Sequence, residues 1–304
     1  MKRDLLTILD LSSEEIDGLL RQAALLKKAW QQGELDRTLA GRTLALLFDK
    51  PSTRTRVSFE VAMYQLGGQV LVLTSRETQL SRQETLADTA RVLSRYIDVL
   101  AVRTFSDAAL QELAHHATIP VINALTDLYH PCQVLSDLLT IQEKKGDYRE
   151  LRIAWVGDGN NVAHSWINAA ARIPFQLVMA CPPGYEPRRE IKEKAEKTAP
   201  YPIEMVADPV EAVAAADVVN TDVWISMGQE EERDRRLAVF RDYQINKSLL
   251  AHAKADVIVM HCLPAHRGEE ITDAVMDGPH SVVWDQAENR LHFQRALLEW
   301  LLRG

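Results

Sequence analysis

The feature of this sequence that most constrains its fold is a repeated alternation of short apolar segments with helical segments. Thr43–Phe48, Val99–Arg103 and Arg152–Val156 are almost uniformly apolar, which is typical of strands buried on both faces. A helical pattern follows nearly every such segment. Strict alternation of buried strands with helices predicts parallel sheets that are covered by helices on both faces.

The same patterns give the expected elements by residue range. Strands are expected at 43–48, 69–73, 99–103, 120–124, 152–156, 176–180, 203–206, 218–221, 257–260 and 282–284. Helices are expected at 53–66, 85–96, 107–116, 133–145, 163–172, 188–197, 209–215, 246–251 and 287–302. A further helix is expected after Ser12, because Ser12 and Glu15 have the spacing of a capping box.

The alternation occurs in two runs that meet near residue 145. It therefore predicts an α/β fold with two doubly wound parallel-sheet domains. We expect residues 1–145 to form the first domain and residues 146–286 the second, with the C-terminal helix within 287–304 packing back on the first. Ligands of such sheets bind beyond the carboxyl ends of the strands, so the active site is expected in the interdomain cleft.

Composition excludes several classes of function. The chain has 304 residues and a formal net charge of −8, which argues against a nucleic-acid or anionic-membrane partner. Its three cysteines are scattered, without the spacing of a disulfide framework or a zinc site. No apolar run approaches the ~20 residues that span a membrane, and the N-terminal segment lacks the apolar stretch of a signal peptide. These features predict a soluble cytoplasmic protein.

The stretch Ser52-Thr53-Arg54-Thr55-Arg56 lies where the first expected strand is followed by a helix. Free N–H groups and the helix dipole favour an anion at a helix N-terminus, and hydroxyl and guanidinium donors add to that preference. The plainer interpretation is a helix capped by Ser52 and followed by solvated arginines. Within the stretch, Arg56 is one helical step past the cap and fits a structural role.

Further polar residues come directly after predicted strands, where the ligand edge of the sheets is expected. The clusters that contain them are Arg103 to Phe105, His130 to Gln133, Gly157 to Asn161, Asp222 to Gly228, and His261 to Pro264. Each alone has a plainer interpretation as a capped turn, a surface charge or a buried small side chain. Gly157-Asp158-Gly159 starts like a dinucleotide fingerprint, but Val162 stands where the third glycine belongs. Together, several such clusters at strand ends favour a binding site.

Taken together, these segments resemble the aspartate/ornithine carbamoyltransferase (transcarbamoylase) family. Ser52 to Arg56 and His130 to Gln133 resemble its carbamoyl-phosphate motifs, whereas Asp222 to Gly228 and His261 to Pro264 resemble those of its ornithine-specific members. The resemblance covers essentially the whole chain. It implies an enzyme that transfers the carbamoyl group of carbamoyl phosphate to the δ-amine of L-ornithine, giving L-citrulline and phosphate in arginine biosynthesis. It implies no metal and no other cofactor.

The resemblance also implies roles for individual residues. Carbamoyl phosphate would be bound by Ser52, Thr53, Arg54, Thr55, Gln79, Arg103, His130, Gln133 and Arg290. Ornithine would be bound by Asn161, Asp222, Ser226, Met227, Cys262 and Leu263, with Asn160 competing for the role of Asn161. The catalytic residues would be Thr55, Arg103 and His130, which stabilise the oxyanion, and Cys262, whose thiol Asp222 polarises. Gln133 would hold the carbamoyl amide.

One stretch departs from the family pattern. Residues 79–84 align with a loop that family members donate to a neighbouring subunit, and Ser81 and Gln83 stand there where glycines are commoner. If Gln79 reaches a neighbour's phosphate site, an isolated monomer lacks a complete site. The resemblance thus implies a homotrimer.

Other functions remain open on the sequence. Within the family, the acceptor alternatives are an N-acylornithine or putrescine, whereas aspartate would call for cations in place of Asp222. Outside it, Gly157-x-Gly159 suggests a dinucleotide-binding protein. A catalytically silent paralogue that acts as a binding subunit is a third possibility, and the complete set of expected site residues argues against it.

Overall fold

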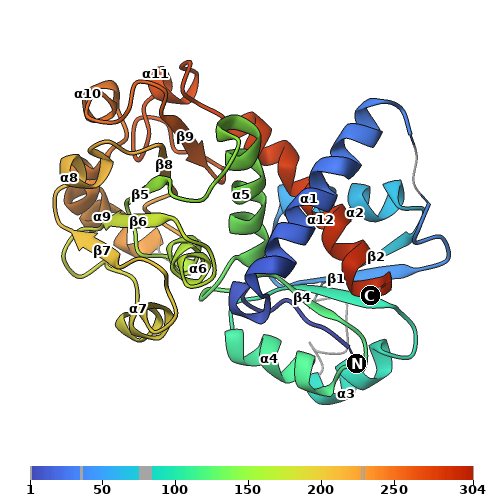
Figure 1. The fold of residues 1–304 in the computed structure, drawn as a ribbon. Coiled ribbons are helices and arrows are strands. Elements are labelled where there is room, and N and C mark those ends of the chain that lie inside the picture. The colour runs from blue at the N-terminus through green and yellow to red at the C-terminus, as the bar shows by residue number, and fades with distance from the viewer. Residues whose placement is uncertain (1, 35–36, 75–83, 227, 229, 304) are drawn as a thin grey trace. The chain divides into compact units, whose positions relative to one another are not determined.

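The computed structural model describes residues 2–34, 37–74, 84–226, 228 and 230–303 (Figure 1). It divides into two units, which we describe separately. Unit 1 consists of Met1–Leu139 and Glu288–Gly304, and unit 2 of Thr140–Ala287. The boundaries between the units therefore fall within helix α5 (Pro131–Lys145) and helix α12 (Val283–Arg303).

Unit 1 is built on a four-stranded sheet in which every pairing is parallel. The strand order is β2-β1-β3-β4, formed by Gln69–Thr74, Thr43–Phe48, Val99–Arg103 and Val121–Leu125. The chain moves from β1 to β2 on one side and then returns to β3 on the other. Phe48 pairs with Arg103, so the loops that follow β1 and β3 emerge side by side at this switch of strand order.

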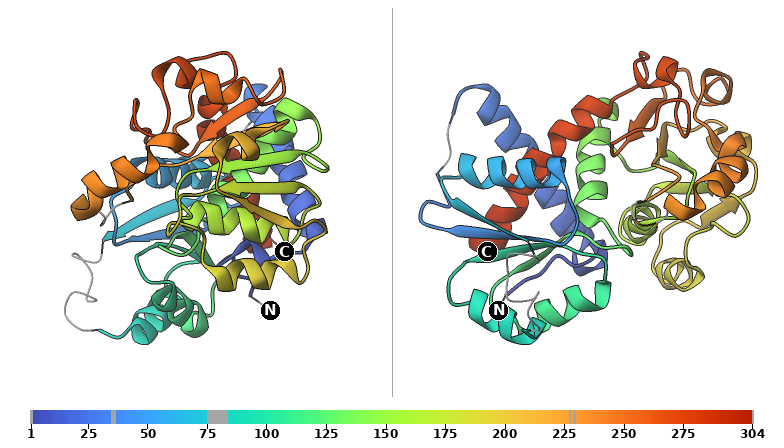
Figure 2. Two further views of the ribbon diagram at one scale, coloured as in Figure 1. Left: turned by 90° about the vertical axis from the view of Figure 1, so that its left-hand side faces the viewer. Right: turned by 180° about the vertical axis from the view of Figure 1, so that it is seen from behind.

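Helices cover both faces of this sheet. α3 (Leu86–Leu93) and α4 (Asp107–His116) lie on one face, and α1 (Ser13–Gln31), α2 (Thr53–Gln65) and α12 on the other (Figures 1 and 2). The expected capping box is confirmed, because Ser12 and Glu15 each accept the other's backbone N–H. A short 3-10 helix, Ile8–Asp10, precedes α1.

Unit 2 contains a five-stranded sheet that is also wholly parallel. Its order is β7-β6-β5-β8-β9, formed by Ile203–Val206, Gln176–Ala180, Arg152–Val156, Val218–Thr221 and Ile258–His261. Its helices are α6 (Asn161–Ala170), α7 (Arg189–Glu196), α8 (Pro209–Val213), α9 (Arg233–Phe240), α10 (Lys247–Leu250) and α11 (Asp273–Met276), with 3-10 turns at Glu230–Glu232 and Arg241–Tyr243. The order reverses between β5 and β8, which places a second ligand-binding edge there.

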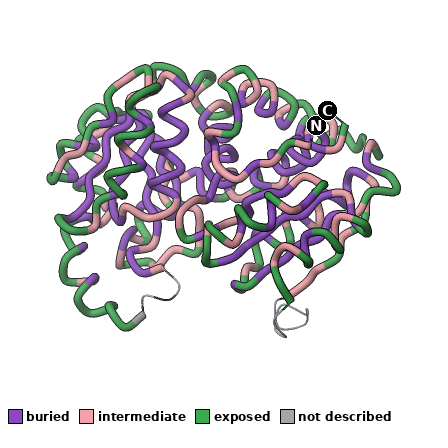
Figure 3. The backbone as a smooth tube through the Cα atoms, turned by 90° about the horizontal axis from the view of Figure 1, so that it is seen from below, coloured by how far each residue is buried: buried purple, intermediate pink, exposed green. Residues whose placement is uncertain are grey.

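The predicted α/β fold is confirmed, since both sheets are parallel and, in each, the central strands are buried. Figure 3 shows the buried segments of the backbone in purple. Nine of the expected strands are found within one residue of their predicted ends. The strand expected at 282–284 is wrong, because α12 begins at Val283. The β-branched pair Val282-Val283 favours a strand locally. Val282 instead donates a single backbone bond to Val259 and accepts the N–H of Gln286 at the start of the helix, while the Gln286 side chain accepts the N–H of His261. α9 and α11 were not expected.

No helix in the described part of the chain is both long enough and apolar enough to cross a membrane.

Candidate active site

The first polar cluster lies in unit 1, beyond the carboxyl ends of β1, β3 and β4. Ser52 is the N-cap of α2, and its hydroxyl accepts the N–H of Thr55 at 3.3 Å. Thr53 and Arg54 follow in the first turn and are exposed, whereas Thr55 is buried. The capping interpretation is therefore correct for Ser52, and the same helix start leaves the Arg54 side chain open to a ligand.

Buried cations surround Thr55 and His130 in this cluster. Arg290, on α12, donates from Nη2 to the Thr55 hydroxyl at 2.5 Å, and Arg103 is buried at the end of β3. Burial, followed by the positive charges of Arg290 and Arg103, holds the pKa of His130 well below its usual value. His130 is therefore a neutral imidazole at physiological pH, which suits hydrogen bonding to a developing oxyanion.

Lys50 joins the loops that carry this cluster, and sequence reasoning missed it. Its ammonium lies 4.0 Å from the centre of the Phe105 ring and forms an ion pair with Asp127. Phe105 follows β3 and Asp127 follows β4, so one buried cation touches all three strand-end loops. The signal in the sequence was its place beside the Ser52 motif.

Gln133 lies in the first turns of α5 and is almost completely buried. Its Nε2 donates to Asp137 at 2.8 Å, while its Oε1 has no hydrogen-bond partner among the described residues. A buried acceptor of this kind is open to a donor from a ligand.

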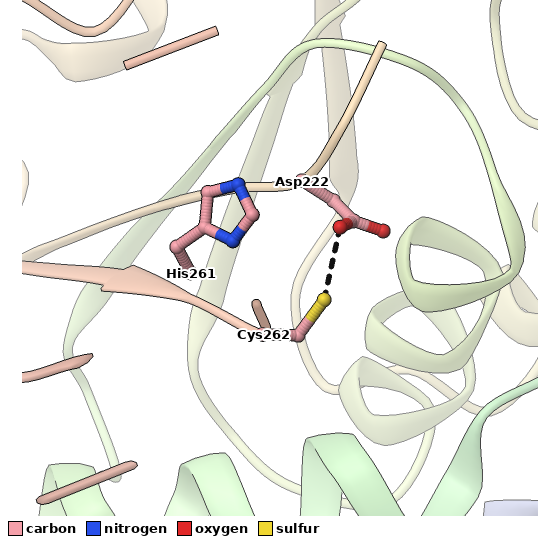
Figure 4. Close-up of side chains that lie close together, drawn as sticks. All are labelled: Asp222, His261 and Cys262. Atoms are coloured by element: carbon pink, nitrogen blue, oxygen red, sulfur yellow. Dashed lines mark hydrogen bonds between the residues drawn. The ribbon is translucent and has the colours of Figure 1, made fainter. Parts of the chain in front are cut away.

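The second polar cluster lies in unit 2, beyond β5, β8 and β9, and Asp222 is at its centre. One carboxylate oxygen of Asp222 accepts from the Cys262 thiol at 2.9 Å (Figure 4). The other accepts from Asn160 Nδ2 at 2.7 Å. Asn160 also caps α6 by accepting the N–H groups of Val162 and Ala163. Asp222 is thus held in one orientation, directly beside the thiol.

The structure distinguishes the two neighbouring asparagines. Asn160 contacts Asp222, whereas Asn161 is the first residue of α6 and is half-buried beside it. Ser226 is half-buried as well. Gln79 and Met227 lie outside the described residues.

His261, next to Cys262, orders the loop after β9. Its Nδ1 accepts the N–H of Leu263 at 2.9 Å, and its Nε2 lies 3.0 Å from the buried Glu270 carboxylate. Leu263 has a φ of 59°, in the left-handed region that a leucine rarely adopts. Asp222, His261 and Cys262 come close enough to suggest a metal site, but both imidazole nitrogens are already engaged. The arrangement fits a rigid binding loop better than a metal centre.

Arg236, on α9, is a second functional candidate that sequence reasoning missed. It forms an ion pair with Asp158 at 2.8 Å and donates from Nε to the Trp224 carbonyl at 2.6 Å. Its guanidinium lies 4.7 Å and 5.4 Å from the ring centres of Tyr185 and Phe240. Burial raises the pKa of Asp158 to about 6, although Arg236 opposes the shift. The signal in the sequence was an acidic residue at a strand end, which needs a cation when buried.

The glycines after β5 pack against protein instead of a cofactor. A Cβ atom at Gly159 would lie 2.2 Å from the Pro187 nitrogen, so the absence of a side chain here serves a close approach of two backbone segments. This contact accounts for Gly159 and removes the support that it lent to a dinucleotide-binding protein.

The fold and the two clusters define a class: a two-unit parallel α/β protein with an anion-type site in one unit and an acidic, thiol-bearing site in the other. The chain belongs to the aspartate/ornithine carbamoyltransferase family. Residues 3–143 match the model of its carbamoyl-P binding domain, and residues 149–301 match that of its Asp/Orn binding domain.

Relatives within the family are similar over their whole length. The ornithine carbamoyltransferase of Syntrophus aciditrophicus is 59% identical, with 99% of this chain and 100% of the relative covered. The solved structure of the ornithine carbamoyltransferase of Pyrococcus furiosus superposes with a TM-score of 0.96 at 52% identity, covering 100% of this chain and 98% of that one. The anabolic ornithine carbamoyltransferase of Campylobacter jejuni gives a TM-score of 0.92 at 41% identity, with 99% of each covered.

Proposed function

We propose that this protein transfers the carbamoyl group of carbamoyl phosphate to the δ-amine of L-ornithine, giving L-citrulline and phosphate. The observation that carries the proposal is the contact of Asp222 with Cys262 and Asn160, because it builds an acidic acceptor site. A carboxylate suits the cationic amino groups of ornithine, whereas aspartate would require cations there.

In the first cluster, Ser52, Thr53 and Arg54 bind the phosphate at the N-terminus of α2, where the helix dipole adds to their charge-assisted bonds. Thr55, Arg103 and His130 stabilise the oxyanion that forms when the amine attacks the carbamoyl carbon. Because His130 is neutral, it donates a hydrogen bond without competing with Arg103 for the phosphate. Removal of one such preorganised donor typically lowers the rate about 10²–10³-fold. Phosphate then leaves.

In the second cluster, Asp222 meets the α-ammonium of ornithine, while Asn161, Ser226 and Met227 meet its α-carboxylate. Cys262 and Leu263 line the site of the δ-amine. That amine loses a proton before it attacks, so activity should rise from neutral to alkaline pH. An N-acylornithine lacks the α-ammonium that Asp222 binds, and putrescine lacks the carboxylate, which makes both weaker candidates. Relatives named anabolic support a role in arginine biosynthesis.

We also propose a cytoplasmic homotrimer in which Gln79 reaches a neighbour's phosphate site. Exposed apolar side chains support a subunit contact in unit 1: Val57 and Tyr64 on α2, and Leu71 on the adjoining edge strand β2. Three cysteines that form no disulfide suit a reducing compartment. Light scattering coupled to gel filtration should give three times the chain mass, and a monomer with full activity would contradict the trimer.

The test of the function is an acceptor panel with carbamoyl phosphate, in which L-ornithine, acetylornithine, putrescine and aspartate are compared in one assay of phosphate release. L-Ornithine should give citrulline and the highest kcat/KM. Equal or better turnover of another acceptor would refute the assignment.

Two neighbouring arginines provide a matched pair of variants. Arg54→Ala should abolish carbamoyl-phosphate binding while leaving the circular dichroism unchanged. Arg56→Ala removes an exposed pair with Glu60 at 2.9 Å, and it should leave carbamoyl-phosphate binding nearly unchanged. Equal losses in both variants would indicate a general charge effect and remove the Ser52 motif from the mechanism.

A further inference from the structure

The orientation of the Gln133 amide is determined by a neighbour that has no assigned role. Asp137 lies one helical turn further along α5 and is completely buried, and its carboxylate accepts from Gln133 Nε2 at 2.8 Å. A carboxylate offers only acceptors, so a reversed amide would bring two oxygens into contact. Asp137 therefore leaves Gln133 Oε1 as the end of the amide that has no hydrogen-bond partner among the described residues.

His130 and Gln133 come from one short stretch of the chain at the start of α5. Gln133 N–H donates to the His130 carbonyl at 3.2 Å, which places both residues in the same turn. A carbamoyl group carries an oxygen acceptor and an NH₂ donor on one carbon. A neutral imidazole and a buried amide oxygen without a partner are complementary to these two groups.

We propose that Asp137 is a positioning residue for substrate choice: by holding the Gln133 amide, it makes the site select a carbamoyl group over other acyl groups. The inference rests on the proposed function. Acetyl phosphate carries a methyl group where carbamoyl phosphate carries NH₂, and it would leave Gln133 Oε1 buried without a donor. A site built to hydrogen-bond a substrate group rejects the analogue that lacks it for this reason.

A purely structural role for Asp137 makes a different prediction. If the pair only stabilises α5, replacement of Asp137 weakens all ligands alike through loss of helix stability. If Asp137 orients Gln133, replacement weakens carbamoyl phosphate selectively.

The test uses Asp137→Asn, whose amide offers both a donor and an acceptor and so allows Gln133 to turn either way. We expect kcat/KM for carbamoyl phosphate to fall about 10–100-fold, the range for one buried hydrogen-bonding group left without a partner. The inhibition constant of acetyl phosphate should change less than about threefold, and so should the dissociation constant of inorganic phosphate, which serves as the control for an intact phosphate site. Equal weakening of all three ligands, or unchanged selectivity, overturns the inference.

Gln133→Met keeps the side-chain length and removes both the oxygen and the NH₂ group of the amide. It provides a second test that does not depend on the stability of Asp137→Asn. It should lower the preference for carbamoyl over acetyl phosphate to a similar extent. The double variant should lose little more than either single variant, because both act through one hydrogen bond. Additive losses, or retained preference in Gln133→Met, overturn the inference. A wild-type protein that does not use carbamoyl phosphate would instead refute the proposed function.

Discussion

Arg236→Met offers the sharpest test of how the second cluster is held together. The guanidinium compensates the buried Asp158 carboxylate at 2.8 Å and donates to the Trp224 carbonyl in the loop that follows Asp222. Methionine fills much of the same volume between Tyr185 and Phe240 without a charge. The variant therefore leaves Asp158 buried and without its cation.

The pKa of Asp158 sets the magnitude and the pH window. A rise from 3.8 to about 6 means that the ionised carboxylate already costs about 3 kcal/mol at neutral pH. Because the folded-state pKa is raised, this cost is absent below the unfolded pKa, grows between about 3.8 and 6, and is constant above that. Without Arg236 the pKa rises further, and a broken buried pair costs about 3–5 kcal/mol. Near pH 5 the variant's Asp158 is protonated, so only the lost hydrogen bond and ring contacts remain, about 1–3 kcal/mol.

Equilibrium urea unfolding at pH 8 and pH 5 measures both values. Tryptophan fluorescence is a suitable signal, since Trp224 stacks on Phe240 with ring centres 5.7 Å apart. We expect the destabilisation by Arg236→Met to be about 2 kcal/mol larger at pH 8, and Asp158→Asn in the same chain to remove most of that difference. The KM for ornithine should rise more than that for carbamoyl phosphate. Equal destabilisation at the two pH values would refute the reasoning.

Three further predictions concern individual residues. His130→Ala should lower kcat about 10²–10³-fold. Because the pKa of His130 is well below its usual value, the variant should keep the shape of the wild-type pH–rate profile above pH 6. A break near pH 6.5 that disappears in the variant would contradict this. Lys50→Met should raise the KM for carbamoyl phosphate about tenfold, because it removes the ion pair that holds Asp127. Lys50→Arg keeps the charge and should leave this KM unchanged. A change confined to the KM for ornithine would contradict the prediction. Burial raises the pKa of Cys132 to about 12, so that its thiol is protonated at pH 8. A thiol reagent at pH 8 should therefore modify the half-buried Cys262 before Cys132, which peptide mapping can check. Modification of Cys132 first would contradict this.

Much of the fold was predictable because buried parallel strands carry their own signal. Segments such as Thr43–Phe48 are apolar along their whole length, and the structure places that strand at the predicted residues. The prediction failed at 282–284, where β-branched residues favoured a strand. In the structure, β9 meets this segment only through an isolated bridge between Val259 and Ser281 and through the Gln286 side chain, which accepts the N–H of His261. It also missed α9, half of whose residues are charged and whose buried residues are Arg236 and Phe240.

The polar clusters were predictable to the extent that strand ends mark the ligand edge of a parallel sheet. Ser52, Arg103, His130, Asp222 and Cys262 all lie there. What the sequence did not reveal are pairs between residues far apart in the chain. Arg236 meets Asp158, and Lys50 meets Asp127, only because the topology brings their loops together.

By itself, the sequence determined the strands, the helix starts and the residue types available for an anion and for an amino acid, because these depend on neighbours within a few positions. Only the tertiary structure decided the chemical state of those residues. His130 is neutral because folding buries it and brings Arg290 from the C-terminal helix beside it. Burial and long-range charge set a pKa, and neither is written in a local stretch of sequence.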